Sequence, residues 1–299
     1  MTGSSVSFSN KISSTPTLLS DLRGRIAEIE RGGGPGREEA GAAVVALGVA
    51  DIDSALPGGG LPRGRLHEVA AAGPKVDGDV AALGFAAALL GRVVNDDGGE
   101  KGGTVLWCAN RKSLYCAGGL HGPGLAAFGV DARRLILIDG ADDTEVLWAM
   151  EEGLRSGALG AVAGEVGNLN LAASRRLQLA AEAGGGFGLL VRVSTKKTAK
   201  TVTAATTRWE VGAASGQSDP MGVRTVAGAL EGLGRACWDV VLARCRGGTE
   251  RRWRVEWNHE THCFAVAAPV AGQPAVPGPR TSDGRVIDLS RDLPRRAAG

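Results

Sequence analysis

The chain has 299 residues, which is long enough for one large domain or two small ones with a sizeable core. Hydrophobic residues make up 43%, but no apolar run is as long as a membrane span, and the N-terminus lacks the apolar region of a signal peptide. The net charge of +2 gives no overall attraction to nucleic acid, and the five cysteines form no CxxC pair, so we expect a reduced, cytoplasmic, globular protein rather than a disulfide scaffold.

The N-terminal region, residues 1–43, is predicted to be distinct from the rest of the chain. Residues 1–16 are rich in Ser and Thr without periodicity, which is typical of a disordered arm. Residues 18–30 predict one amphipathic helix, and a Gly-rich linker follows it. The apolar stripe of this helix can be buried on the chain's own core or on a neighbouring subunit, and the sequence leaves both open. The stripe consists of Leu18, Leu19, Leu22, Ile26 and Ile29.

From residue 44 to about residue 212, short β-like runs alternate with helical patterns. The predicted strands are residues 65–70, 104–109, 134–140, 160–166 and 187–193. The predicted helices are residues 80–94, 118–128, 144–155 and 171–183. This alternation predicts an α/β fold with a mostly parallel sheet and helices on both of its faces.

After residue 212 the hydrophobic period becomes that of half-exposed antiparallel strands. The four alternating runs are residues 206–214, 235–245, 251–258 and 262–268. Residues 246–249 predict a hairpin turn between two of them. These strands either extend the parallel sheet at the C-terminal end of the core, residues 44–268, or form a small appendage. Their tryptophans are expected to pack in the core or on a sheet face rather than against bases.

The C-terminal tail, residues 269–299, is rich in Pro and Gly and ends in a short apolar and charged motif, VIDLSRDL, at residues 286–293. We predict that this motif binds a partner, because Ile287, Leu289 and Leu293 would otherwise be exposed without benefit. The alternative is a frayed end.

The segment from Gly73 to Val80 has the spacing of a phosphate-binding loop between a predicted strand and a helix predicted to begin near Val80. In such a loop, G-x-x-x-x-G-K-[ST], the glycines allow close backbone approach, the lysine supplies charge and the hydroxyl binds Mg²⁺. Gly73 and Gly78 keep the spacing, but Asp79 and Val80 replace the lysine and the hydroxyl residue. An aspartate about 4 Å from a phosphate charge is repelled by about 4 kcal/mol at an effective dielectric of 20. We therefore expect no ATP hydrolysis here, unless Lys75 supplies the charge in a different loop geometry.

Residues 48–69, GVADIDSALPGGGLPRGRLHEV, resemble the entry to the ATP-binding core of RecA-type recombinases. The similarity extends from about residue 17 to residue 268 and implies a RecA-like, P-loop NTPase-type fold. In this family a strand ends in a glutamate that orients the attacking water, and Asn110 stands at the matching position. Glu165 lies where the family's Walker-B aspartate would be. Because the lysine, the Mg²⁺ ligand and the catalytic glutamate are replaced together, the resemblance implies a scaffold without ATPase chemistry, hence no enzyme and no cofactor.

Within that superfamily the chain resembles the ImuA family most. The residues that carry this resemblance are the helix LLSDLRGRIAEIE, the run GGGLPRGRLHEV, residues 205–214 and residues 244–258. It implies an accessory or adaptor protein in DNA-damage-induced (SOS) mutagenesis and translesion synthesis, located in the cytoplasm at the nucleoid. The implied partners are an ImuB-type inactive Y-family-like polymerase and an error-prone polymerase of the polymerase III alpha type, with RecA as a further candidate.

A lysine-rich segment follows the predicted strand at residues 187–193. Lys196, Lys197 and Lys200 lie among small polar residues, which suits contacts to the phosphates of single-stranded DNA without reading of the bases. In RecA-like folds a DNA-binding loop follows this strand. Arg175 and Arg176 lie near the family's other DNA loop. The alternative for the lysine segment is an ordinary solvated surface loop, and the sequence does not decide between the two.

The spacing of His259, His262 and Cys263 resembles that of metal ligands, but positions three apart on a strand point to opposite faces, so no metal site is predicted. Two other functions remain as alternatives. An ATP-dependent recombinase regulator would have to bind ATP measurably, and a SulA-like inhibitor of cell division would cause filamentation when expressed.

Overall fold

The computed structural model describes residues 43–96, 103–110, 120–192, 202–216, 223–225, 228–230, 235–246 and 250–267. The predicted N-terminal helix, the three lysines of the segment 193–201 and the C-terminal motif lie outside these ranges. Predictions about them therefore stay predictions.

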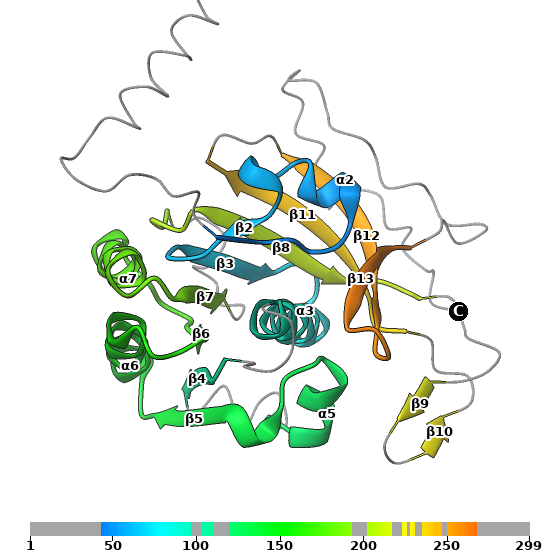
Figure 1. Ribbon diagram of the computed structural model, residues 1–299, viewed down its shortest axis with the longest axis horizontal. Helices are drawn as coiled ribbons and strands as arrows, with labels where there is room; N and C mark the ends of the chain where they lie inside the picture. The colour runs from blue at the N-terminus through cyan, green and yellow to red at the C-terminus, as the bar shows by residue number, and fades with distance from the viewer. Residues whose placement is uncertain are drawn as a thin grey trace, which may run out of the picture. The chain divides into compact units, whose positions relative to one another are not determined.

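A nine-stranded sheet with the order β13-β12-β11-β8-β3-β7-β6-β4-β5 organises the core (Figure 1). Its six parallel strands are β3 (Leu66–Ala71), β4 (Val105–Asn110), β5 (Leu135–Gly140), β6 (Ala161–Glu165), β7 (Phe187–Arg192) and β8 (Thr207–Ala213). The antiparallel strands are β11 (Cys237–Cys245), β12 (Arg251–Asn258) and β13 (Cys263–Val266). The predicted α/β class with a mostly parallel sheet and antiparallel strands at its C-terminal end is confirmed.

The strand β8 joins the two parts of the sheet. The sequence predicts it as antiparallel, but it pairs in parallel with β3 on one side and antiparallel with β11 on the other. The three later strands therefore extend the parallel sheet and do not form a separate appendage. Two small antiparallel pairs complete the described strands: β1 (Val44–Val45) with β2 (Leu61–Pro62), and β9 (Val223–Thr225) with β10 (Gly228–Leu230).

Helices cover both faces of the parallel strands, as predicted. The helix α3 (Lys75–Asn95) lies on one face, and α6 (Asp143–Ser156) and α7 (Leu171–Gly184) lie on the other (Figure 1). A short helix, α5 (Gly122–Ala127), packs on the α3 side through Leu125. The remaining short elements are α2 (Ala50–Asp53), η1 (Pro57–Gly59) and η2 (Ala132–Arg134).

The core on the α3 side is aromatic. Phe85 of α3 lies 6.1 Å from Trp209, 5.7 Å from Trp238 and 5.4 Å from Phe264 between ring centroids. Trp209, Trp238 and Trp257 are all buried. This burial confirms that the late tryptophans pack within the core, because a ring held inside the sheet cannot stack on a base.

The ends of α6 and α7 follow ordinary capping chemistry. The side chain of Asp142 accepts hydrogen bonds from the backbone N–H groups of Thr144 and Glu145, and Asn170 accepts one from Ala173. Gly157 and Gly185 end the two helices with positive φ angles of 65° and 72°. These caps satisfy the free backbone groups of the first and last turns.

His67 of β3 is a neutral histidine inside the sheet. Its Nε2–H donates to the carbonyl oxygen of Pro62 at 3.0 Å, and its Nδ1 accepts from the hydroxyl of Thr207 at 2.8 Å. The ring stacks on Phe187 with 4.6 Å between centroids. Burial lowers the pKa of His67 to about 4 from its ordinary value near 6.5. Protonation would remove the acceptor that Thr207 needs.

We expect acid to destabilise the protein through this group. Between pH 6.5 and 4 the unfolded chain protonates His67 while the folded chain does not, so the free energy of unfolding falls by roughly 3 kcal/mol as the pH drops. Urea denaturation at pH 7, 5.5 and 4 measures this loss. The variant His67→Gln should lose less stability over the same interval, and an unchanged slope in that variant would contradict the assignment.

Candidate functional site

The carboxyl ends of the parallel strands form the edge at which open α/β sheets usually bind ligands. The structure brings to this edge the connection after β3, Asn110 at the end of β4, Glu165 at the end of β6 and Arg192 at the end of β7. The candidate site is therefore built from these strand ends outward.

The connection between β3 and α3 is only three residues long. The helix begins at Lys75, so the prediction that it begins near Val80 is wrong, and Gly78, Asp79 and Val80 are helical. The backbone N–H of Gly78 donates to the carbonyl oxygen of Pro74 at 2.7 Å. A phosphate loop needs such amides free to face the ligand, and here the amide of Gly78 is already used within the helix.

The two glycines are explained by this tight connection. Gly73 has a φ of 86°, a conformation that side chains rarely adopt. At Gly78 a Cβ atom would lie 2.6 Å from the carbonyl oxygen of Ala72, closer than two such atoms can approach. The glycine spacing that resembles a phosphate loop therefore serves the close packing of a strand end against a helix.

The charged side chains in the first turn of α3 form an ion pair with each other. Lys75 Nζ lies 2.8 Å from Asp79 Oδ2, an i,i+4 ion pair on the helix surface. Lys75 thus neutralises the aspartate that replaces the motif lysine. Val80, one position further, is 55% exposed and offers no oxygen to a cation.

Glu165 and Asn110 lie at the same edge but on opposite faces of the sheet. Glu165 is buried on the α3 side, where its Oε1 accepts a hydrogen bond from the indole N–H of Trp107 at 2.8 Å. Asn110 faces α6, and its amide donates to Asp143 Oδ1 at 3.2 Å. Asp143 also accepts from the backbone N–H of Asn168 at 2.8 Å. The two residues that the sequence assigns to one site are therefore engaged in separate contacts.

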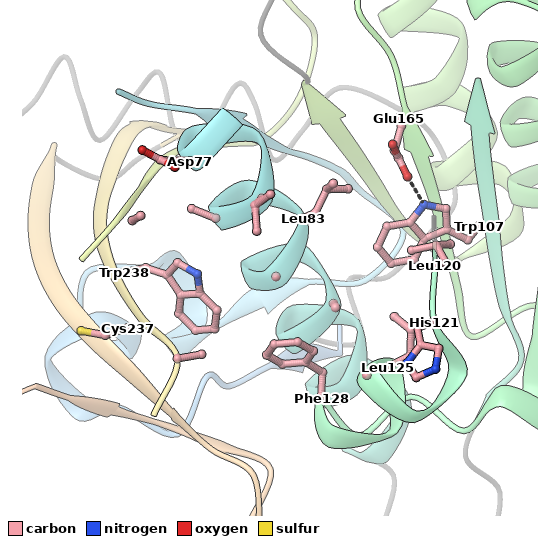
Figure 2. Close-up of a pocket in the computed structure, with 17 residues that line it drawn as sticks. Asp77, Leu83, Trp107, Leu120, His121, Leu125, Phe128, Glu165, Cys237 and Trp238 are labelled. Carbon is pink, nitrogen blue, oxygen red and sulfur yellow. Dashed lines mark hydrogen bonds between the residues drawn. The ribbon is translucent and has the colours of Figure 1, made fainter. Parts of the chain in front are cut away.

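An apolar pocket of about 500 Å³ lies on the α3 side of this edge (Figure 2). Figure 2 shows Trp107 on one side of α3 and Trp238 on the other, with Phe128 below. Leu83 of α3 also lines it, and Glu165 is among its few polar groups. Volumes of about 300 to 1,000 Å³ with a mainly apolar lining are typical of sites that bind a ligand or a side chain. Sequence reasoning missed this pocket, because its lining comes from six separated stretches of the chain.

A buried charged network lies on the other face of the sheet, where Glu68, Arg208 and Arg244 are neighbours across β3, β8 and β11. Glu68 of β3 accepts a hydrogen bond from the hydroxyl of Thr203 at 2.5 Å, and its carboxylate lies 3.8 Å from Arg208. Arg244 donates to the same hydroxyl at 3.2 Å and to the carbonyl oxygen of Ala205 at 2.6 Å. The network therefore gathers several charged side chains around one carboxylate.

Arg192, the last residue of β7, belongs to this network and is only 1% exposed. Its Nη2 donates to the carbonyl oxygen of Gly167 at 3.2 Å, while its Nε and Nη1 have no hydrogen-bond partner among the described residues. Burial lowers the pKa of the Arg192 guanidinium, and the attraction of Glu68 opposes this. Burial likewise lowers the pKa of Arg244. Buried guanidinium groups destabilise the fold unless a negative charge lies near them, and the carboxylate of Glu68 supplies that charge.

The residues on either side of the lysine segment are held by side-chain hydrogen bonds. Arg192, directly before residues 193–201, donates to the carbonyl oxygen of Gly167, and Thr203, closely after them, donates to Glu68. The backbone N–H of Ala204 donates to the hydroxyl oxygen of Ser174 on α7 at 3.0 Å. The chain thus returns beside the first turns of α7.

Arg175 and Arg176 are exposed on α7, directly after Ser174. Arg176 pairs with Glu151 of α6 at 3.2 Å, which reduces its free charge. Arg175 and Arg176 therefore follow the residue that contacts Ala204, and the lysines themselves lie outside the described residues.

The late histidines serve local packing. His259 Nδ1 lies 3.0 Å from the carbonyl oxygen of Ala127, and the ring of His262 stacks on Trp257 at 6.3 Å. Within the described ranges, no group of three or more His, Cys, Asp or Glu side chains could hold a metal ion. None of the described helices is long and apolar enough to cross a membrane.

These features define an α/β protein whose sheet carries an apolar pocket at the strand ends on one face and a buried, arginine-rich network on the other face. No protein-family model matches the chain. The chain is 34% identical over 238 residues to a protein named ImuA in each of two strains of Caulobacter vibrioides, a match that covers 76% of this chain and 90% of each relative. The chain belongs to the ImuA family.

We expect Glu68 to be the residue on which the buried network depends. Glu68→Gln should lower the free energy of unfolding by roughly 3 kcal/mol, because buried arginines lose their counter-charge. Glu210→Gln is the matched control, since Glu210 also lies 3.8 Å from Arg208 but its side chain is 44% exposed. This control should change stability by less than about 1 kcal/mol in urea denaturation. Equal losses in the two variants would contradict a special role for Glu68.

Proposed function

We propose that this chain is a non-catalytic accessory protein of the ImuA–ImuB mutagenesis system, which acts in DNA-damage-induced translesion synthesis. Membership of the ImuA family supports the assignment of the chain to this mutagenesis system. The short β3–α3 connection, the bonded amide of Gly78 and the Lys75–Asp79 pair support the absence of ATPase chemistry. A RecA-like scaffold without hydrolysis would then act by binding.

The proposed ligand is single-stranded DNA, held through its phosphates by Lys196, Lys197 and Lys200. The observation that carries this proposal is that both flanks of the lysine segment are held in the described fold, by the bond of Arg192 to the carbonyl oxygen of Gly167 and by the bond of Thr203 to buried Glu68. Fixed ends limit the conformations of the segment, so fewer are lost when the lysines bind a phosphate backbone. Arg175 and Arg176 beside its base would add to the positive surface.

The proposed protein partners are an ImuB-type inactive Y-family-like polymerase and an error-prone polymerase III alpha-type enzyme, with RecA as a further candidate. In this arrangement the chain bridges DNA and the polymerase. The N-terminal stripe of Leu18, Leu22 and Ile26 is one candidate surface for such contacts.

Reversing the three lysine charges tests the DNA proposal. The variant Lys196→Glu/Lys197→Glu/Lys200→Glu should lose single-stranded DNA retention at low salt. Each lost phosphate contact removes about 0.7 from the slope of log affinity against log salt, so any residual binding should show a slope smaller by roughly 2. Fluorescence anisotropy of a labelled oligonucleotide measures both quantities.

The matched control changes the same amount of charge elsewhere. Arg133→Glu/Arg134→Glu/Arg251→Glu alters exposed arginines at the starts of β5 and β12, none of which contacts Glu68 or Thr203 in the described part of the chain. This control should retain most of the affinity and the original salt slope. The proposal fails if the two triple variants behave alike, or if the lysine variant binds as the unaltered protein does.

A further inference from the structure

We propose that the apolar pocket beside α3 binds the C-terminal motif of the same chain, residues 286–293. This inference is independent of the DNA-binding proposal. It rests on the lining of the pocket, on its charge and on the place where the described chain ends.

The pocket presents apolar side chains from several elements to one open space. Leu83 and Val80 come from α3, Phe128 follows α5, and Trp238 comes from β11 (Figure 2). Val80 is 55% exposed although it borders the pocket. Apolar surface left open to water in this way is stabilised when other apolar groups cover it. Ile287, Leu289 and Leu293 are apolar side chains of the same chain that need such a cover.

The charges of the pocket and the motif are complementary. Among the described residues that line the pocket, Asp77 and Glu165 are charged and His121 is a histidine. The motif and its flanks, residues 285–296, carry four arginines and two aspartates, a net charge of +2. Because Glu165 is buried and bonded to Trp107, an arginine next to the apolar anchors would meet the exposed carboxylate of Asp77 while the anchors enter the pocket.

The described chain ends close to the pocket. Val266 of β13 pairs with Val255 of β12, and Val255 pairs with Trp238 of β11, whose side chain lines the pocket. Two strand spacings separate the backbones of Val266 and Trp238, about 10 Å. Nineteen residues, 268–286, connect the described part to Ile287, and this length can span up to about 60 Å. A tether of this length gives the motif a high effective concentration at the pocket.

A labelled peptide of residues 284–297, GRVIDLSRDLPRRA, is the probe for this contact. In the full chain the motif already occupies the pocket, so the peptide should bind weakly. In the full-chain variant Ile287→Asp/Leu289→Asp/Leu293→Asp the pocket is vacated, and the peptide should bind at least tenfold more tightly. Binding changes the fluorescence of Trp107 and Trp238, which line the pocket. A scrambled peptide is the control.

A second variant fills the pocket without disturbing the backbone. At Gly84 a Cβ atom would meet the Trp238 side chain at 3.4 Å and that of Phe128 at 3.8 Å, both ordinary contacts. Adding Gly84→Leu to the vacated variant should reduce peptide affinity at least tenfold, while circular dichroism stays unchanged.

Any one of three results would overturn the proposal. The first is equal binding of the peptide to the unaltered and the vacated proteins, and the second is an unchanged peptide affinity after Gly84→Leu is added. The third is a sedimentation result that shows a dimer for the unaltered chain and a monomer for the vacated variant, which would place the motif in the pocket of a second copy.

Discussion

The short distance along the chain between the end of β3 and the start of α3 determines the backbone conformation at this edge of the sheet. Only three residues join the two elements, and the carbonyl oxygen of Ala72 lies where a side chain at position 78 would begin. Gly78 is therefore required by packing alone. With α3 starting at Lys75, the amide of Gly78, the second glycine of the spacing, is bonded to the carbonyl oxygen of Pro74 within the helix. The backbone at the second glycine is therefore that of a helix and not that of a phosphate loop.

Those side chains are satisfied by one another. Glu165 accepts from Trp107, Asn110 donates to Asp143, and Lys75 pairs with Asp79. Buried polar groups that already have partners gain little from a new ligand, because binding would first break existing contacts. What remains for partners is the apolar pocket on the α3 face and the basic region on the other face. The two proposed binding surfaces of this ImuA-family protein therefore lie on opposite faces of one sheet.

Much of the fold could be predicted from the sequence, because its signals are local. The bounds of the five predicted parallel strands lie within two residues of the observed bounds. A continuous apolar run such as residues 187–193 predicts a strand that is buried on both faces. The start of α3 was missed because the glycine spacing dominated the interpretation. Pro74, immediately before the first helical residue, was the available signal, since proline is favoured at helix starts.

The buried network could not be predicted, since it depends on which strands become neighbours. Glu68 meets Arg208 because β3 pairs with β8, and Arg192 lies opposite Ala70 through the β3–β7 register. A single charged residue in an apolar strand indicates that a partner exists, but the pairing that supplies the partner is a property of the tertiary fold. The pocket has the same origin, since Trp107 and Trp238 are more than one hundred residues apart in the sequence.

Equilibrium dialysis of ATP with Mg²⁺ tests the central claim most directly. We expect no saturable binding to the unaltered chain, and none to Asp79→Lys/Val80→Thr, because the double variant restores the motif's residue types on a segment that remains helical. Saturable binding by the unaltered chain would contradict the account. A gain of binding in the double variant would show that the side chains, and not the short connection, exclude the nucleotide.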